Sequence, residues 1–180
     1  MPLSDVLPSS SGNLRLVTLQ DLANRAKALA DEIHGKIPWF KVREWFKVTA
    51  VTFAARRDGS VVAVVSGSGR GLESASVEHV QSLTTHDEFG RPNMVLATNI
   101  PDTHAERNAV IYMAENDLRP LAGAAYLNAC SPEGCNELVQ KVGATMYGPI
   151  TIATKKKIPG QAQYFWGDYQ AWSRYVEHGE

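Results

Sequence analysis

Cysteine is scarce in this chain of 180 residues: only two occur, Cys130 and Cys135, inside one window of six positions. A framework of structural disulfides needs more cysteines at wider spacing, which excludes the class of small disulfide-stapled domains. A close pair of this kind is instead typical of a metal site or of a local bridge.

Net charge is almost absent as well, at −1 for pH 7. No overall positive field therefore draws the protein to nucleic acid, although a small basic groove is compatible with this balance. No apolar run approaches the roughly 20 residues of a membrane-spanning helix, and the first residues lack the regions of a secretory signal peptide. We expect no membrane partner and a place in the cytoplasm, either of the producing cell or of a target cell that receives the chain as an effector.

The length predicts a single domain with one substantial core. Residues 1–13 are rich in serine and proline and are expected to form a flexible leader. The domain then covers residues 14–180, with its core over residues 48–154 and an aromatic C-terminal helix over residues 164–176.

Hydrophobic periodicity predicts a helix from about Thr18 to Ile33, and Asp58-Gly59 between β-branched runs predicts a hairpin of residues 48–55 and 61–66. The expected elements after the hairpin are a helix over 72–83, a strand over 94–98, a helix from His104, a strand over 121–128, a helix after Pro132 and a strand over 144–154. This order predicts an α/β fold, with a mixed sheet of about five strands, a parallel edge beside the hairpin and helices on both faces.

Residues 37–47 combine aromatic and basic side chains: Trp39, Phe40, Trp45 and Phe46 with Lys41, Arg43 and Lys47. Such side chains can stack on and clamp a nucleic-acid strand, or the aromatic ones can join the core at a corner between helix and strand. We favour the core interpretation for the aromatic side chains.

Three polar segments have alternative interpretations. The run Ser66-Gly67-Ser68-Gly69-Arg70-Gly71 lacks the ending of a phosphate loop, so we interpret it as a flexible loop that borders a pocket. His86, Asp87 and Glu88 could form a second metal site, but a solvated loop is favoured. The lysines at 155–157 are either solvated or flank a substrate groove.

A histidine and a glutamate open the helix expected after Thr103, in the sequence His104-Ala105-Glu106. Cys130 ends a predicted strand and Cys135 begins the next helix. One imidazole and two thiolates supply three zinc ligands and leave the fourth tetrahedral position open for water, as in catalytic zinc sites. Glu106 is not a ligand in this arrangement and could move protons for a zinc-activated hydroxide.

These motifs resemble those of the cytidine-deaminase superfamily of zinc-dependent deaminases, in which His-x-Glu on one helix is paired with Pro-Cys-x-x-Cys on the next. The resemblance covers roughly residues 48–154 and implies a three-layer sandwich. Asn99 followed by the run His104–Ala109 is most similar to deaminase domains of bacterial polymorphic toxins. One departure concerns the second motif: four residues separate Cys130 from Cys135, and the proline follows the first cysteine. This change reshapes a loop that borders the substrate.

The resemblance implies Zn²⁺ as the cofactor, held by His104, Cys130 and Cys135. Glu106 would take a proton from zinc-bound water and deliver it to the ring nitrogen, while hydroxide attacks C4 of cytosine and ammonia leaves. The candidate substrate contacts are Asn99, Thr103, Ser131 and Pro132.

The implied activity is that of a hydrolase acting on the C–N bond of a cyclic amidine, converting cytosine to uracil in single- or double-stranded DNA or in RNA. A toxin-type enzyme would also have a cognate immunity protein as a partner. One alternative is a deaminase of a free nucleoside, nucleotide or base, which the net charge favours slightly. A second alternative is a non-catalytic zinc-stabilised binding module, but no third cysteine exists to close its metal site.

Overall fold

The computed structural model describes residues 16–41, 47–126, 145–147 and 163–166. Its central feature is a hairpin of β1 (Thr49–Ala55) and β2 (Val61–Gly67), paired antiparallel along their whole length. At the turn, Gly59 has a φ of +86°, and Asp58 Oδ1 accepts a hydrogen bond from the Ser60 N–H at 2.9 Å. The predicted hairpin is confirmed.

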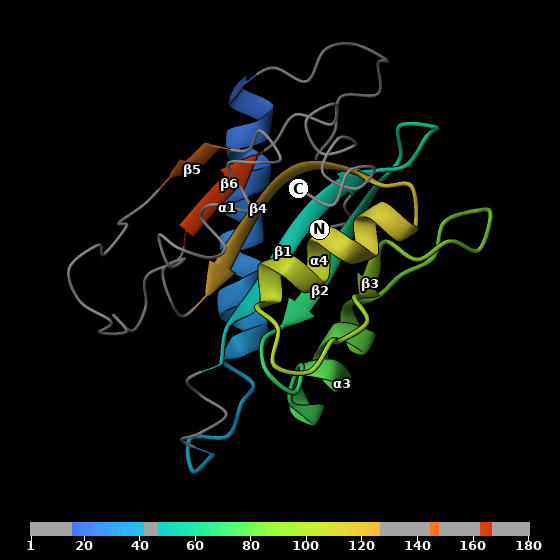
Figure 1. The fold of residues 1–180 in the computed structure, drawn as a ribbon. Coiled ribbons are helices and arrows are strands. Elements are labelled where there is room, and N and C mark those ends of the chain that lie inside the picture. Colours follow the sequence, from blue (N-terminus) through green and yellow to red (C-terminus); the bar gives the residue numbers. More distant parts are fainter. Residues whose placement is uncertain (1–15, 42–46, 127–144, 148–162, 167–180) are drawn as a thin grey trace.

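The hairpin is the middle of one open mixed sheet with the strand order β3-β2-β1-β4-β6-β5 (Figure 1). β3 (Met94–Leu96) pairs parallel with β2, whereas β4 (Arg119–Tyr126) pairs antiparallel with β1. β6 (Gln163–Trp166) pairs antiparallel with β4 and with β5 (Thr145–Tyr147). The parallel pair therefore lies beside the hairpin, and the general prediction of an α/β fold with a mixed sheet is confirmed.

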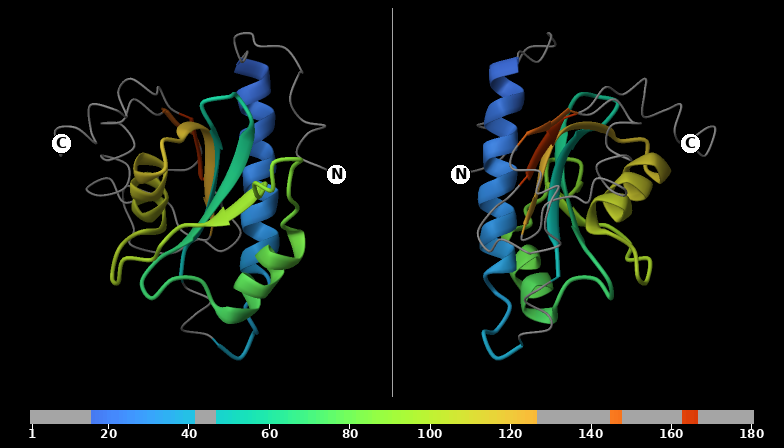
Figure 2. Two further views of the ribbon diagram at one scale, coloured as in Figure 1. Left: turned by 90° about the vertical axis from the view of Figure 1, so that its right-hand side faces the viewer. Right: turned by 60° about the vertical axis from the view of Figure 1, so that its left-hand side comes forward.

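Helices cover both faces of the sheet, which gives three layers (Figure 2). On one face lie α1 (Leu16–His34) and α3 (Ser74–Leu83), and on the other lies α4 (Ala105–Glu115). Because successive side chains of a strand point to opposite faces, Val51 and Phe53 pack toward α1 while Ala54 packs toward α4. All seven residues of β1 are buried as a result.

The apolar stripe of α1 forms the core on its face of the sheet, as its periodicity predicts. Leu22, Ala26, Ala30 and Ile33 have no exposed surface. At its end, the Ser76 hydroxyl of α3 donates a hydrogen bond of 2.9 Å to the Ile33 carbonyl, which ties the two helices together. Of the helices that the structure describes, none is long and apolar enough to cross a membrane.

The core interpretation of the aromatic segment is wrong for two of its members. Trp39 is 86% exposed and Phe40 is 65% exposed, and their rings make an edge-to-face contact at 6.0 Å. The chain turns after α1 through hydrogen bonds that bury Ile37, so the next residues project from the tip of the connection. Trp45, Phe46 and Arg43 lie outside the described residues.

The C-terminal helix expected over residues 164–176 is also wrong at its start. Tyr164, Phe165 and Trp166 belong to β6, where they pair with β4 and β5. Aromatic side chains favour the pleated surface of a sheet, so tertiary pairing decides the conformation of this run. The rest of that helix, the leader over 1–13, the helix after Pro132 and the lysines at 155–157 lie outside the described residues.

Candidate functional site

The candidate site lies at the end of the sheet where α4 begins. His104 is the N-cap residue of α4, with φ and ψ of −67° and 147°, and its exposed side chain makes no capping hydrogen bond. Glu106 follows in the first turn and is only 3% exposed. A carboxylate in this position is favoured by the positive end of the helix. The site thus places an exposed imidazole and a buried carboxylate on one turn of a helix.

A hydrogen bond to β2 fixes the start of α4 on the sheet. The buried Ser66 hydroxyl donates to the carbonyl of Ala105 at 2.7 Å. Ser66 pairs across the sheet with Ala50, which in turn pairs with Ala125 of β4, and Ala105 packs on these two alanines. The small side chains let the helix approach closely, so its first turn sits over one row of residues in the three central strands.

Asn108 joins the helix to the chain that leads into it. Its side-chain nitrogen donates to the Gly67 carbonyl at 3.0 Å and to Asn99 Oδ1 at 3.2 Å. Its side-chain oxygen accepts a hydrogen bond from the Ile100 N–H at 3.2 Å. Asn108 is only 1% exposed, so these bonds satisfy a polar group that burial would otherwise penalise. Asn108 therefore links β2 and the segment before His104 to α4.

The glycine-rich run after β2 is hydrogen-bonded to the same segment rather than forming a loose loop. The Gly69 N–H donates to the Thr103 carbonyl at 3.1 Å, and the Asp102 N–H donates to the Gly69 carbonyl at 3.0 Å. The Asn99 side chain donates to the same Gly69 carbonyl at 3.3 Å. The run therefore lies beside the residues that precede His104 and is hydrogen-bonded to them.

Two positions in this run require glycine. A Cβ atom at Gly67 would lie 2.7 Å from the backbone of Gly71 and Leu72. Gly71 has a φ of +90°, and a Cβ atom there would lie 3.1 Å from the Asn99 side chain. On the opposing segment Asp102 also adopts a left-handed φ of 59°, a conformation that aspartate tolerates better than most residues.

The candidate substrate contacts fall into two groups. Asn99 and Thr103 lie in the described loop before α4, where the Asn99 amide bonds within the loop network and the Thr103 hydroxyl donates to the Pro101 carbonyl at 3.3 Å. Ser131 and Pro132 lie outside the described residues. The two proposed thiolate ligands, Cys130 and Cys135, also lie outside them.

Within the described ranges, no three histidine, cysteine, aspartate or glutamate side chains come together as a metal site. The segment after α3 therefore gives no support to a second metal site at His86. Asp87 Oδ1 instead accepts hydrogen bonds of 2.9 Å from the N–H groups of Phe89 and Arg91, which organises the segment as a loop. The loop interpretation of this segment agrees with these contacts.

Ser66 and Asn108 both position the site, although the sequence patterns assign neither of them a role. Asn108 carries a weak signal, since it is a polar residue between the buried Ala105 and Ala109 of an otherwise apolar helix face. Ser66 carries none, because a serine at the end of a strand has many roles. Comparison of the chain with protein-family models, with characterised proteins and with solved structures gives no significant match.

Proposed function

We propose that the chain is a zinc-dependent hydrolytic deaminase that converts cytosine to uracil. The observation that carries the proposal is the burial of Glu106 two residues after the exposed His104, at the start of α4. A carboxylate held beside the open position of a metal site can accept a proton from water and return it to the substrate.

The path of the chain supports the proposed ligand set. Tyr126, the last residue of β4, pairs with Thr49, which pairs with Gly67 at the end of β2. The chain thus leaves β4 at the end of the sheet where α4 begins. Cys130 follows Tyr126 by four residues, and four residues of extended chain reach at most about 14 Å. His104, Cys130 and Cys135 would hold the metal.

The proposed chemistry assigns Glu106 the proton transfers. In the net reaction water adds at C4 of cytosine, the bond from C4 to the amine breaks, and ammonia leaves. The Glu106 carboxylate would accept a proton from the water and donate it to nitrogen of the base. Zinc bound by the three ligands would supply a hydroxide at neutral pH. Ser66 and Asn108 would keep the carboxylate in place by fixing the first turn of α4.

A polynucleotide is the substrate class that the exposed aromatic residues favour. Trp39 and Phe40 project from the connection between α1 and β1, and Lys36 beside them is exposed too. Exposed aromatic rings with nearby cations stack on successive bases of single-stranded nucleic acid. The connection ends at β1, whose first residue lies at the same end of the sheet as the start of α4. A free nucleoside, nucleotide or base is the alternative substrate, favoured by the near-neutral net charge.

Deamination assays on single-stranded DNA, double-stranded DNA, RNA and cytidine test the proposal. Zinc-loaded protein is expected to convert cytosine to uracil in a polynucleotide, and Glu106→Gln is expected to lower kcat by about 10²- to 10⁴-fold with zinc content unchanged. Glu115→Gln, at the exposed end of the same helix, is the matched control and should retain activity.

The outcomes separate the alternatives. Activity on cytidine alone would assign the protein to the free-nucleoside class. Bound zinc without activity on any substrate, or full activity in Glu106→Gln, would overturn the deaminase proposal. A toxin-type deaminase would also be neutralised by a cognate immunity protein, which co-expression with neighbouring open reading frames can test.

A further inference from the structure

A cavity of about 390 Å³ lies at the other end of the sheet, beyond the last residues of α4. Its floor is apolar and includes Val62 of β2, Val95 of β3 and Leu118. Arginine side chains and the ring of Tyr112 line the same cavity. Its volume is within the range of small-molecule sites, which combine an apolar lining with a few placed polar groups.

Arg56 is the charged group of this cavity that lacks a counter-charge. Two of its five N–H donors are used, by the Pro92 carbonyl at 2.5 Å and by the Ser60 hydroxyl at 3.4 Å, and both acceptors are neutral. Among the described residues no carboxylate lies within ion-pair distance of Arg56. A half-buried guanidinium is more stable when an anion accompanies it.

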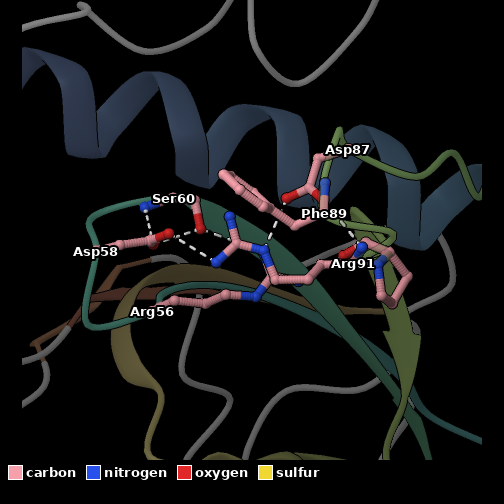
Figure 3. A network of polar contacts seen from close by, with 7 residues as sticks. Arg56, Asp58, Ser60, Asp87, Phe89 and Arg91 are labelled. Carbon is pink, nitrogen blue, oxygen red and sulfur yellow. Dashed lines mark hydrogen bonds and ion pairs between the residues drawn. The ribbon is translucent and has the colours of Figure 1, made fainter.

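The other two arginines of the cavity, Arg57 and Arg91, each have a carboxylate partner, and Figure 3 shows the contacts of Arg91. Arg91 donates to Asp58 Oδ2 at 2.6 Å and to Asp87 Oδ2 at 2.8 Å, and Phe89 lies under its guanidinium at 5.1 Å. Arg57 forms an ion pair with Asp117. These carboxylates therefore already have cationic partners. The three arginines and the three aspartates of this region balance in charge, and Arg56 is the one arginine among them without a carboxylate in ion-pair contact.

We propose that this cavity binds a small organic anion, in which a phosphate or carboxylate group is carried on a flat apolar body. The anion would pair with the unused N–H donors of Arg56, and the apolar body would cover Val62, Val95 and Leu118. Tyr112 adds an aromatic side chain to the lining. This site is independent of the proposed catalytic function, because none of its residues belongs to the start of α4.

Binding is tested by calorimetry with four probes: phenyl phosphate, benzoate, inorganic phosphate and phenol. We expect phenyl phosphate or benzoate to bind at least tenfold more tightly than inorganic phosphate and phenol, because only these two probes combine an anion with an apolar ring. Arg56→Gln should weaken that binding by about tenfold or more, as expected when a charged hydrogen bond is lost. A preference for phenyl phosphate over benzoate, or the reverse, distinguishes a phosphate ligand from a carboxylate ligand.

Two further variants distinguish a loss of binding at the cavity from a loss of folding. Arg70→Gln removes the same charge at the far end of the sheet and should leave the affinity unchanged. Asn116→Trp places a large ring on an exposed residue that lines the cavity, and it should abolish binding without removing Arg56 from the hairpin. Failure of both ring-bearing anions to bind, equal affinity for inorganic phosphate, or unchanged binding in Arg56→Gln and Asn116→Trp would each overturn the proposal. Deaminase activity does not enter any of these readouts.

Discussion

Single polar side chains decide how the start of α4 is held. Asn108 makes three hydrogen bonds from a buried position, and Asn116, at the other end of the helix, makes one from an exposed position. Removing the first should leave the Gly67 carbonyl and the Ile100 N–H without their partner. Buried groups left in this state cost free energy, whereas exposed ones rebind water.

Asn108→Ala is therefore expected to lower the free energy of unfolding by about 1–3 kcal/mol. Asn116→Ala should change it by less than about 0.5 kcal/mol, as is usual for exposed positions. Urea titrations of the two variants beside the parent protein measure both values. Equal stability of the two variants would show that the Asn108 network does not hold the fold together.

The exposed aspartates around Arg91 make stability depend on pH. Hydrogen bonds from Ser60, together with Arg91, hold the pKa of Asp58 well below its usual range. The pKa of Asp87 is lowered chiefly by the hydrogen bond from the Arg91 N–H. Carboxyl groups with a lowered pKa in the folded state stabilise it above the unfolded pKa of about 3.9, and this stabilisation is lost as pH falls below that value.

We expect the free energy of unfolding to fall with decreasing pH only below about pH 4–5, and Asp58→Asn to reduce the size of that fall. Because both side chains are largely solvent-screened, the effect should be modest. Urea titrations at pH 7, 5 and 3 measure it. A fall that is already complete at pH 5, or one unchanged in Asp58→Asn, would assign the pH dependence to other groups.

At the residue scale, the sequence is informative where spacing itself carries the chemistry. His104 and Glu106 are singled out because the His-x-Glu spacing resembles a motif of zinc-dependent deaminases. Ser66 and Asn108 are missed because their roles depend on partners brought together by folding, at sequence separations of 39 and 41 residues. The exposure of Trp39 is not predicted for the same reason, since the sequence of an aromatic-rich segment does not indicate which rings are buried.

In the glycine-rich run, position 67 has no room for a side chain. Gly67→Ala places a methyl group 2.7 Å from backbone atoms that cannot move without breaking the loop. Gly90→Ala is a matched control, because its φ is +75° but no atom lies within 4 Å of the added carbon. The control thus carries conformational strain alone, whereas Gly67→Ala carries a steric clash.

We expect Gly67→Ala to lower the free energy of unfolding by about 1–3 kcal/mol through overpacking. It should also impair any activity of the site, because the displaced backbone is bonded to Asn108 and lies beside Asn99. Gly90→Ala should cost about 1 kcal/mol and leave activity unchanged. Denaturant titration and the deamination assay give the two readouts; an unperturbed Gly67→Ala protein would contradict the argument.

The exposed aromatic residues between α1 and β1 lead to a separate prediction about substrate binding. Trp39→Ala should weaken binding of single-stranded DNA by about 5- to 100-fold, the usual effect of removing one stacking ring, with little change in stability. Phe89→Ala removes another ring, 73% exposed but at the other end of the sheet, and should leave binding unchanged. Fluorescence anisotropy with a labelled oligonucleotide measures both; equal losses would point to nonspecific contact.

At the element scale, local patterns predict the hairpin and α1. Asp58-Gly59 between β-branched runs marks the hairpin turn, and burial of one face sets the period of α1. The short aromatic run of β6 has no such period, and its pairing with β4 and β5 comes from segments distant in sequence. The parallel pairing of β3 with β2 likewise depends on the crossover through α3. The order of elements predicts a parallel edge beside the hairpin, but it does not state which strand forms that edge.

The two proposed sites lie at opposite ends of one sheet. The proposed metal site joins α4 to the chain that follows β4, so a metal there would link two layers of the fold. Ligands that bind only the folded state raise its apparent stability. Removing zinc with a chelator is thus expected to lower Tm by several degrees in the parent protein.

His104→Ala should abolish this response to the chelator, whereas His86→Ala, in the loop after α3, should retain it. Thermal unfolding followed by circular dichroism, with zinc content measured in parallel, gives the comparison. A chelator effect that persists in His104→Ala would place the metal elsewhere in the chain.

The hydrogen bonds of Gly69 with Asp102 and Thr103 bring together the two ends of a long segment, residues 70–101. Between these points the chain forms α3 and β3 and then returns beside the residue from which it departed. The position of His104 is therefore set where the two ends of this segment meet, by the hydrogen bonds of Gly69 and by those that join Asn99 and Ile100 to Asn108. We expect the part of this segment before Asn99 to tolerate shortening or lengthening without loss of the site. Its replacement must still cover the sheet where Val80 and Met94 now pack.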